Sequence, residues 1–166
     1  VHLVHKYSAR QVMGGVMFGG DGRTVKDLPP GFYTLRFTYK GKEFSIEVKS
    51  LQSNYSKQVE GGWTGRFQVD ASDCRPVKLA NGDRITTTCL VVGEFDFVAV
   101  NLFDFGEEWR FAFAKNYDLP WSPSKQYTPE QRKYLLQTTP KVTWPLQPPF
   151  RDEPYSLLDE MLSESH

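Results

Sequence analysis

The sequence predicts an α/β domain of the α+β kind, with a central mixed β-sheet and flanking helices. Segments 32–39 and 44–50 alternate apolar and polar residues, which is the period of a half-buried strand. An apolar run over 89–103 indicates a further, buried strand, and a helix start follows at Thr128. The 166 residues make about one domain, long enough to bury roughly 70% of its unfolded surface.

The first two strands are expected to form a hairpin, because the turn signal Lys40-Gly41-Lys42-Glu43 separates them. One face of this hairpin is apolar and is predicted to face the core: Tyr33, Leu35, Phe37, Tyr39, Phe44, Ile46 and Val48. The other face is polar: Thr34, Arg36, Thr38, Ser45, Glu47 and Lys49. Matching these faces favours a loop at Gly41-Lys42 and sets Arg36 opposite Glu47.

Glu47 and Lys49 are the residues of this hairpin with the clearest chemical potential. They are two positions apart on a strand, so both side chains point away from the predicted core. Metal-dependent phosphodiesterases use this pair of groups, with a carboxylate that holds Mg²⁺ and a lysine that steadies the attacking water or the phosphorane charge. The alternative interpretation is a cross-strand ion pair on a solvated face, because so short a motif has many chance matches.

The strand ending in Ile46-Glu47-Val48-Lys49-Ser50 resembles the signature strand of the PD-(D/E)XK, or restriction-endonuclease-like, nucleases. An acid-containing strand with Ala99-Val100 and an aromatic strand at 109–114 follow it, as in many of these families, so the resemblance covers 31–115. It implies a restriction-endonuclease-like sheet with a β-rich insertion, and hydrolysis of DNA by an endonuclease or by a nuclease subunit of a defence or restriction-type system. Glu47 would bind Mg²⁺, with Mn²⁺ as a substitute, and Lys49 would orient water or stabilise the transition state.

The chain departs from this family at the first acid, which usually lies on the preceding strand near the position opposite the glutamate. Thr34, Arg36 and Thr38 occupy that face here. Asp96 is our first choice for the second metal ligand. Other acids remain open as alternatives: Asp27, Asp70, Asp73 and Glu94. Without a second acid, the alternative function is a non-catalytic module that binds nucleic acid or protein on a nuclease-derived fold.

The predicted insertion lies between the signature strand and the 89–103 strand. Its segment 51–60 is polar and reads as a short helix or an ordered loop, 65–70 alternates as a strand, and Asn81-Gly82 marks a hairpin turn. Cationic and amide side chains are the donors that contact phosphates. The candidate nucleic-acid-binding residues of the chain are Arg36, Gln52, Lys57 and Arg66.

The C-terminal part is predicted to begin with a helix, because Thr128-Pro129-Glu130-Gln131 is a capping box with proline at the first helical position. This helix is expected to run to Gln137. A proline-rich segment at 144–150 and an acidic amphipathic helix at 155–162 follow, and either could recruit a protein partner.

We therefore expect a single nuclease-like domain over 1–150 and an acidic C-terminal tail or helix over 151–166. Since the chain begins with Val1, one interpretation is that the N-terminal part of the domain is missing. Lys+Arg and Asp+Glu number 20 each, but the tail has one arginine against five acids, near −4, which leaves the body near +4 and compatible with DNA binding. No membrane-spanning run is present, Cys74 and Cys89 are expected to be free thiols, and a cytoplasmic location is expected.

Overall fold

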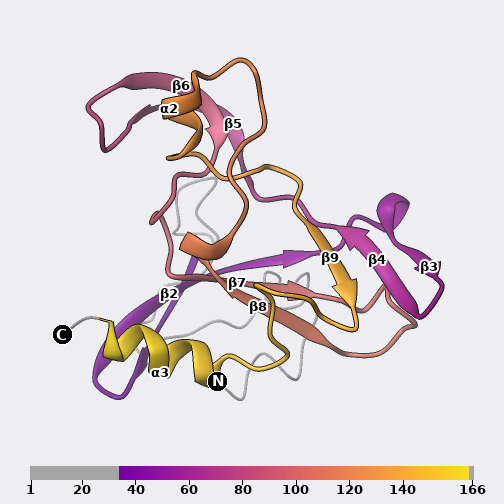
Figure 1. The fold of residues 1–166 in the computed structure, drawn as a ribbon. Helices are drawn as coiled ribbons and strands as arrows, with labels where there is room; N and C mark the ends of the chain where they lie inside the picture. The colour runs from indigo at the N-terminus through magenta and orange to yellow at the C-terminus, as the bar shows by residue number, and fades with distance from the viewer. Residues whose placement is uncertain (1–33, 165–166) are drawn as a thin grey trace.

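The structure is a computed structural model that describes residues 34–164 and shows a mixed α+β fold rich in strands (Figure 1). The strands form a four-stranded, a three-stranded and a two-stranded sheet. The elements in chain order are β1 (Thr34–Tyr39), β2 (Lys42–Ser50), η2 (Ser53–Tyr55), β3 (Lys57–Val59), β4 (Gly62–Arg66), β5 (Asp70–Lys78), β6 (Arg84–Cys89), β7 (Phe97–Asn101), β8 (Phe111–Lys115), η3 (Asn116–Asp118), α2 (Pro129–Arg132), β9 (Lys141–Trp144) and α3 (Tyr155–Ser163). Asp27 lies outside the described residues.

The four-stranded sheet has the order β1-β2-β7-β8 and is mixed, as predicted. β1 and β2 are antiparallel, β2 and β7 are parallel, and β7 and β8 are antiparallel. The parallel pair requires a long crossover, and the elements β3 to β6 supply it. The β-rich insertion expected between the signature strand and the 89–103 segment is therefore present.

The β1–β2 hairpin forms as predicted, but its register differs by two residues. The loop is Lys40-Gly41, because Tyr39 pairs with Lys42 and both loop residues have positive φ, 48° and 82°. Such a two-residue loop matches the twist of the flanking strands. The expected Arg36–Glu47 pairing is therefore wrong: Arg36 lies opposite Ser45, and Thr34 lies opposite Glu47. The shift by an even number keeps each side chain on its predicted face.

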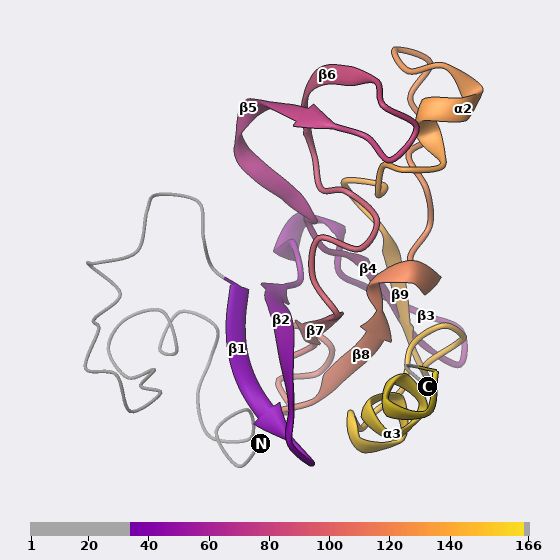
Figure 2. The same cartoon turned by 90° about the vertical axis from the view of Figure 1, so that its left-hand side faces the viewer.

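One face of the four-stranded sheet is covered by α3, which confirms the predicted C-terminal helix (Figure 2). Leu157 and Leu158 of α3 are fully buried. They lie in a core cluster with apolar residues of three strands, namely Phe44, Ile46, Phe97, Ala99, Phe111 and Phe113. The helix thus caps the sheet, whereas the boundary at residue 150 stays a prediction.

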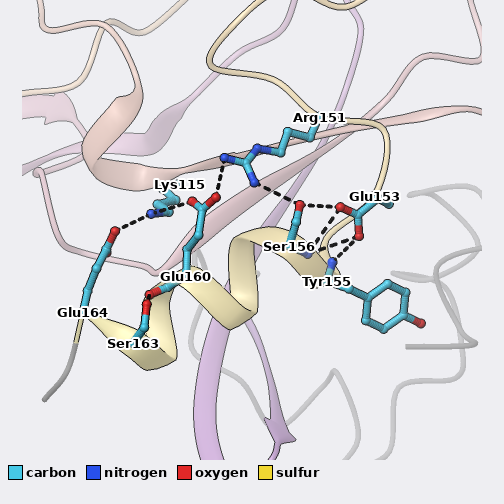
Figure 3. A network of polar contacts seen from close by, with 8 residues as sticks. All are labelled: Lys115, Arg151, Glu153, Tyr155, Ser156, Glu160, Ser163 and Glu164. Atoms are coloured by element: carbon cyan, nitrogen blue, oxygen red, sulfur yellow. Dashed lines mark hydrogen bonds and ion pairs between the residues drawn. The ribbon is translucent and has the colours of Figure 1, made fainter.

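Ion pairs fasten α3 to the sheet (Figure 3). The ammonium of Lys115 at the end of β8 lies 2.7 Å from a Glu164 carboxylate oxygen and 3.1 Å from one of Glu160, and Arg151 lies 2.7 Å from the other Glu160 oxygen. Burial alone would lower the pKa of Lys115, but its hydrogen bonds to Glu164 and Glu160 outweigh burial and raise it. Hydrogen bonds from Arg151 and then Lys115 lower the pKa of Glu160.

The opposite face of the sheet carries a larger core, to which the insertion and the C-terminal part contribute. Its fully buried side chains include Phe67, Val69, Val98, Val100, Leu102, Phe105, Ala112, Ala114 and Leu136. β9 was not predicted, and it pairs with β4 to complete the three-stranded sheet β3-β4-β9. The hairpin at Asn81-Gly82 is confirmed, with β5 and β6 as its arms.

Two predicted elements are wrong in extent. The continuous strand over 89–103 is interrupted, because a turn around Gly93, whose φ is 86°, separates β6 from β7. The Thr128 capping box is confirmed, but α2 ends at Arg132 rather than Gln137. Leu135 and Leu136 are neighbours that enter two different core clusters, and extended backbone points neighbouring side chains to opposite sides, which a helix does not.

Cys74 and Cys89 are free thiols, as expected. Among the helices within residues 34–164, none is long and apolar enough to cross a membrane.

Candidate functional site

Glu47 and Lys49 project from β2 toward the larger core. In the parallel register Glu47 lies beside Val98 and Lys49 beside Val100, and both valines belong to that core. The Glu47 side chain is 9% exposed and that of Lys49 is 20% exposed. The two residues form an ion pair, as in our alternative interpretation, but it lies within one strand and is largely buried rather than cross-strand and solvated.

The Lys49 ammonium lies 2.8 Å from a Glu47 carboxylate oxygen. Residues two positions apart on a strand are separated by roughly 6.6 Å, so the long lysine side chain reaches back along its own strand to the carboxylate. Removing a charged group from water costs several kcal/mol, which a close partner of opposite charge partly offsets. This pair connects two residues of one strand.

Asp96 directly precedes β7 and lies beside Ser45 of β2. Its Oδ2 accepts hydrogen bonds from the Ser45 backbone N–H at 2.6 Å and from the Ser45 hydroxyl at 2.7 Å. The Asp96 backbone N–H in turn lies 3.0 Å from the Ser45 hydroxyl oxygen. Since Ser45 and Glu47 share a face of β2, the structure brings Asp96 to the same side of the sheet as Glu47 and Lys49.

The other candidate acids, Glu94, Asp70 and Asp73, differ from Asp96 in their surroundings. Glu94 forms an ion pair with Arg75 at 2.6 Å and accepts a hydrogen bond from the Val91 backbone N–H. Asp70 accepts a hydrogen bond from the Gln68 amide at 2.9 Å, and Asp73 is exposed. Asp96, bonded to Ser45 of β2, lies directly before the strand that pairs with β2, and its role as a metal ligand stays a prediction.

The donor chemistry of Glu47 and Asp96 fits Mg²⁺ or Mn²⁺. Magnesium takes oxygen ligands and is commonly held by one or two carboxylates together with waters and substrate phosphate oxygens. Ser45 donates two hydrogen bonds to Oδ2 of Asp96, so Oδ1 is the oxygen of this carboxylate that the Ser45 bonds do not use. Within residues 34–164 no group of three or more His, Cys, Asp or Glu side chains could hold a metal ion, so this site would offer two carboxylates.

Three of the four candidate nucleic-acid-binding residues lie around the end of β2 and the three-stranded sheet. The Gln52 backbone N–H donates to the Arg66 carbonyl at 2.9 Å, and the Arg66 guanidinium donates to the Thr139 carbonyl at 2.8 Å. Lys57 is exposed on β3. Arg36 lies apart on β1, where it is highly exposed and paired with Glu43 at 2.7 Å.

Sequence reasoning missed Lys141 and gave Ser45 no role. Alternation had already placed Ser45 on the face of Glu47 and Lys49. Lys141 lies opposite Arg66 in the β4–β9 pair. Its strand is only four residues long and lies between Pro140 and Pro145, so the sequence carries little strand signal there.

Comparison of the chain with protein-family models, with curated proteins and with solved structures finds no match. What can be said of its function therefore rests on the geometry of its own residues.

Proposed function

We propose that this protein is a Mg²⁺-dependent endonuclease, or a nuclease subunit, that hydrolyses phosphodiester bonds of DNA. The observation that carries the proposal is the largely buried Glu47–Lys49 ion pair, with Asp96 directly before the adjacent strand β7. Withdrawing two charges from water is costly, and their mutual attraction offsets this cost only in part.

The arrangement of the strands supports the restriction-endonuclease-like resemblance. The strand with Glu47 and Lys49, the strand with Ala99-Val100 and the aromatic strand are β2, β7 and β8, adjacent in this order. The position opposite Glu47 on β1 is Thr34, where the family usually has its first acid. In this chain the second carboxylate would instead come from the other neighbour of β2, through Asp96.

The roles of the residues follow from their chemistry. Glu47 and Asp96 would hold the cation, which when bound neutralises phosphate charge and activates water. Ser45 holds Asp96 through its backbone N–H and its hydroxyl, which limits the rotation of that carboxylate. The Lys49 ammonium, beside Glu47, would donate hydrogen bonds to the attacking water or to the phosphorane oxygens as negative charge develops.

Two separate substitutions test the proposal: Glu47→Gln and Lys49→Met. We expect each to lower Mg²⁺-dependent cleavage of plasmid DNA by about 100-fold or more, because each removes a group that acts in the transition state. Glu43→Gln is the matched control, since Glu43 lies on the same strand and face but is mostly exposed, and it should cleave like the wild type.

The urea midpoint of every variant shows whether the fold is intact. Cleavage that persists in both variants contradicts the proposal. A wild-type protein that binds DNA but shows neither cleavage nor binding of Mn²⁺ that depends on Glu47 would instead be the non-catalytic binding module.

A further inference from the structure

The two faces of the β3-β4-β9 sheet differ in character. Its inner face contributes Trp63, Gly65, Val142 and Trp144 to the side of the larger core, and Trp63 stacks on Phe105 with ring centroids 5.9 Å apart. Alternation directs the remaining side chains to the outer face. The cross-strand rows of this face are Lys57–Thr64–Thr143 and Arg66–Lys141, and they define what we call the outer face below.

The outer face is cationic. The three strands contain Lys57, Arg66 and Lys141 and no acidic residue. Lys57 and Lys141 are exposed, whereas Arg66 is partly buried and held by the Thr139 carbonyl. The nearest acids along the chain are Glu60, in the β3–β4 turn, and Asp70, which Gln68 binds.

Polar donors extend this face toward β2. The Gln52 backbone N–H donates to the Arg66 carbonyl, and the Gln52 amide nitrogen lies 3.2 Å from the Gln68 amide oxygen. Lysine, arginine, threonine and glutamine are the side chains that bind phosphate oxygens in protein–DNA interfaces. The apolar exception on the outer face is Val59, at the edge strand.

We infer that the outer face binds the phosphate backbone of DNA, an inference that rests on the proposed function for its ligand. Its positive charge and the Thr64 hydroxyl complement a polyanion, and strands without acids avoid repulsion, whereas the Thr143 hydroxyl donates to the Pro145 carbonyl. Lys49 and Gln52 are three residues apart, or about 10 Å along an extended strand, and alternation points them to opposite sides. The outer face therefore holds DNA that flanks the reacting phosphodiester and does not contact the reacting bond itself.

The spacing of the lysines indicates contacts with separate phosphates. Lys57 and Lys141 are two strands and two residues apart, which places their Cα atoms roughly 12 Å from each other. Because strand side chains stand roughly perpendicular to the sheet, we expect each ammonium group to contact its own phosphate. Loss of both contacts should lower the slope of log affinity against log salt by about 1.8, because each phosphate contact contributes about 0.9.

The test compares two double charge reversals, Lys57→Glu/Lys141→Glu and Lys125→Glu/Lys133→Glu. The second pair is a matched control, because both lysines are exposed and lie in or near α2, apart from the three-stranded sheet in both views (Figures 1 and 2). Binding is measured by fluorescence anisotropy on a labelled DNA duplex without divalent cation, over a range of salt concentrations. We expect only Lys57→Glu/Lys141→Glu to lose about tenfold or more in DNA affinity. The same variant alone should show the smaller slope of log affinity against log salt.

Equal losses in both pairs overturn the inference, because net charge rather than this face would then govern binding. Wild-type affinity in the first pair also overturns it, as does tighter binding of an RNA duplex of the same sequence. The charge-reversed protein could fail to fold. The milder Lys57→Gln/Lys141→Gln variant therefore repeats the test, and its DNA affinity should fall in the same direction by a smaller factor. Glu47→Gln should retain DNA binding, so a failed outer face is distinguishable from a failed nuclease assignment.

Discussion

Two clusters of charged residues lie on opposite faces of the same four-stranded sheet, and they differ in what they connect. Lys115, whose side chain is 11% exposed, binds the carboxylates of Glu160 in α3 and of Glu164 directly after it, far along the chain. Glu47 and Lys49 bind each other within β2. The first cluster joins a strand to the C-terminal helix, whereas the printed ion pair of the second joins two residues of one strand.

This difference indicates separate roles. The Lys115 cluster accompanies the burial of Leu157 and Leu158, so its ion pairs and apolar contacts hold α3 on the sheet together. The Glu47–Lys49 pair is largely withdrawn from solvent, and Asp96 adds a second carboxylate on the same side of the sheet. Variants around α3 should therefore change stability, and variants around β2 should change metal binding and cleavage.

The largest expected effect is on stability, from Leu158→Ala. Leu158 is fully buried, and its truncation should lower the free energy of unfolding by about 2–4 kcal/mol, because apolar burial is lost and a cavity remains. Urea unfolding followed by tryptophan fluorescence measures this change. Leu162→Ala, at a partly buried position of the same helix, is the control and should cost clearly less. A change in cleavage per folded molecule without a loss of stability would contradict the division of roles.

The next effect concerns Ser45→Ala, which removes the hydroxyl that holds Asp96 Oδ2 but leaves the backbone N–H bond. We expect the affinity for Mn²⁺ to fall about tenfold, as is typical when a group that orients a metal ligand is removed. Isothermal titration with Mn²⁺ measures it directly. Ser45→Thr keeps the hydroxyl and should bind like the wild type, and Ser50→Ala tests an exposed serine of the same strand. Unchanged Mn²⁺ affinity in Ser45→Ala would argue against Asp96 as a ligand.

The smallest effect is the pH dependence of stability that Glu160 contributes. Arg151 first and then Lys115 lower its pKa in the folded state. A carboxyl group with a lowered folded-state pKa stabilises the protein above its unfolded pKa of about 4.3, and this contribution is lost as the pH falls through the folded value. Wild-type protein should therefore lose more stability than Glu160→Gln between about pH 5 and pH 3. Parallel urea midpoints of the two proteins across this range would contradict the assignment.

The features predicted best from the sequence are those encoded by neighbouring residues. Alternation predicts the faces of β2, and the capping box predicts the start of α2 at Thr128. Sequence reasoning also singled out Glu47 and Lys49, which the structure places within contact distance.

Features that depend on distant partners could not be predicted in the same way. The contact between Ser45 and Asp96 depends on the parallel pairing of β2 with β7, which no local pattern specifies. The early end of α2 depends on two core clusters that draw Leu135 and Leu136 to opposite sides. The β1–β2 register was misassigned because two loops, Gly41-Lys42 and the actual Lys40-Gly41, place every side chain on the same face of the hairpin. The apolar–polar alternation therefore cannot distinguish the two registers.

The crossover between β2 and β7 also affects when the candidate site forms. Ser45 and Asp96 are 51 positions apart, and closing so long a loop carries an entropic cost that slows non-local contacts. On a ribosome, Ser45 and Glu47 would emerge well before Asp96 is synthesised. A nascent or partly unfolded chain would then present one carboxylate without its counterpart, so hydrolysis would await completion of the sheet and incomplete copies would leave DNA intact.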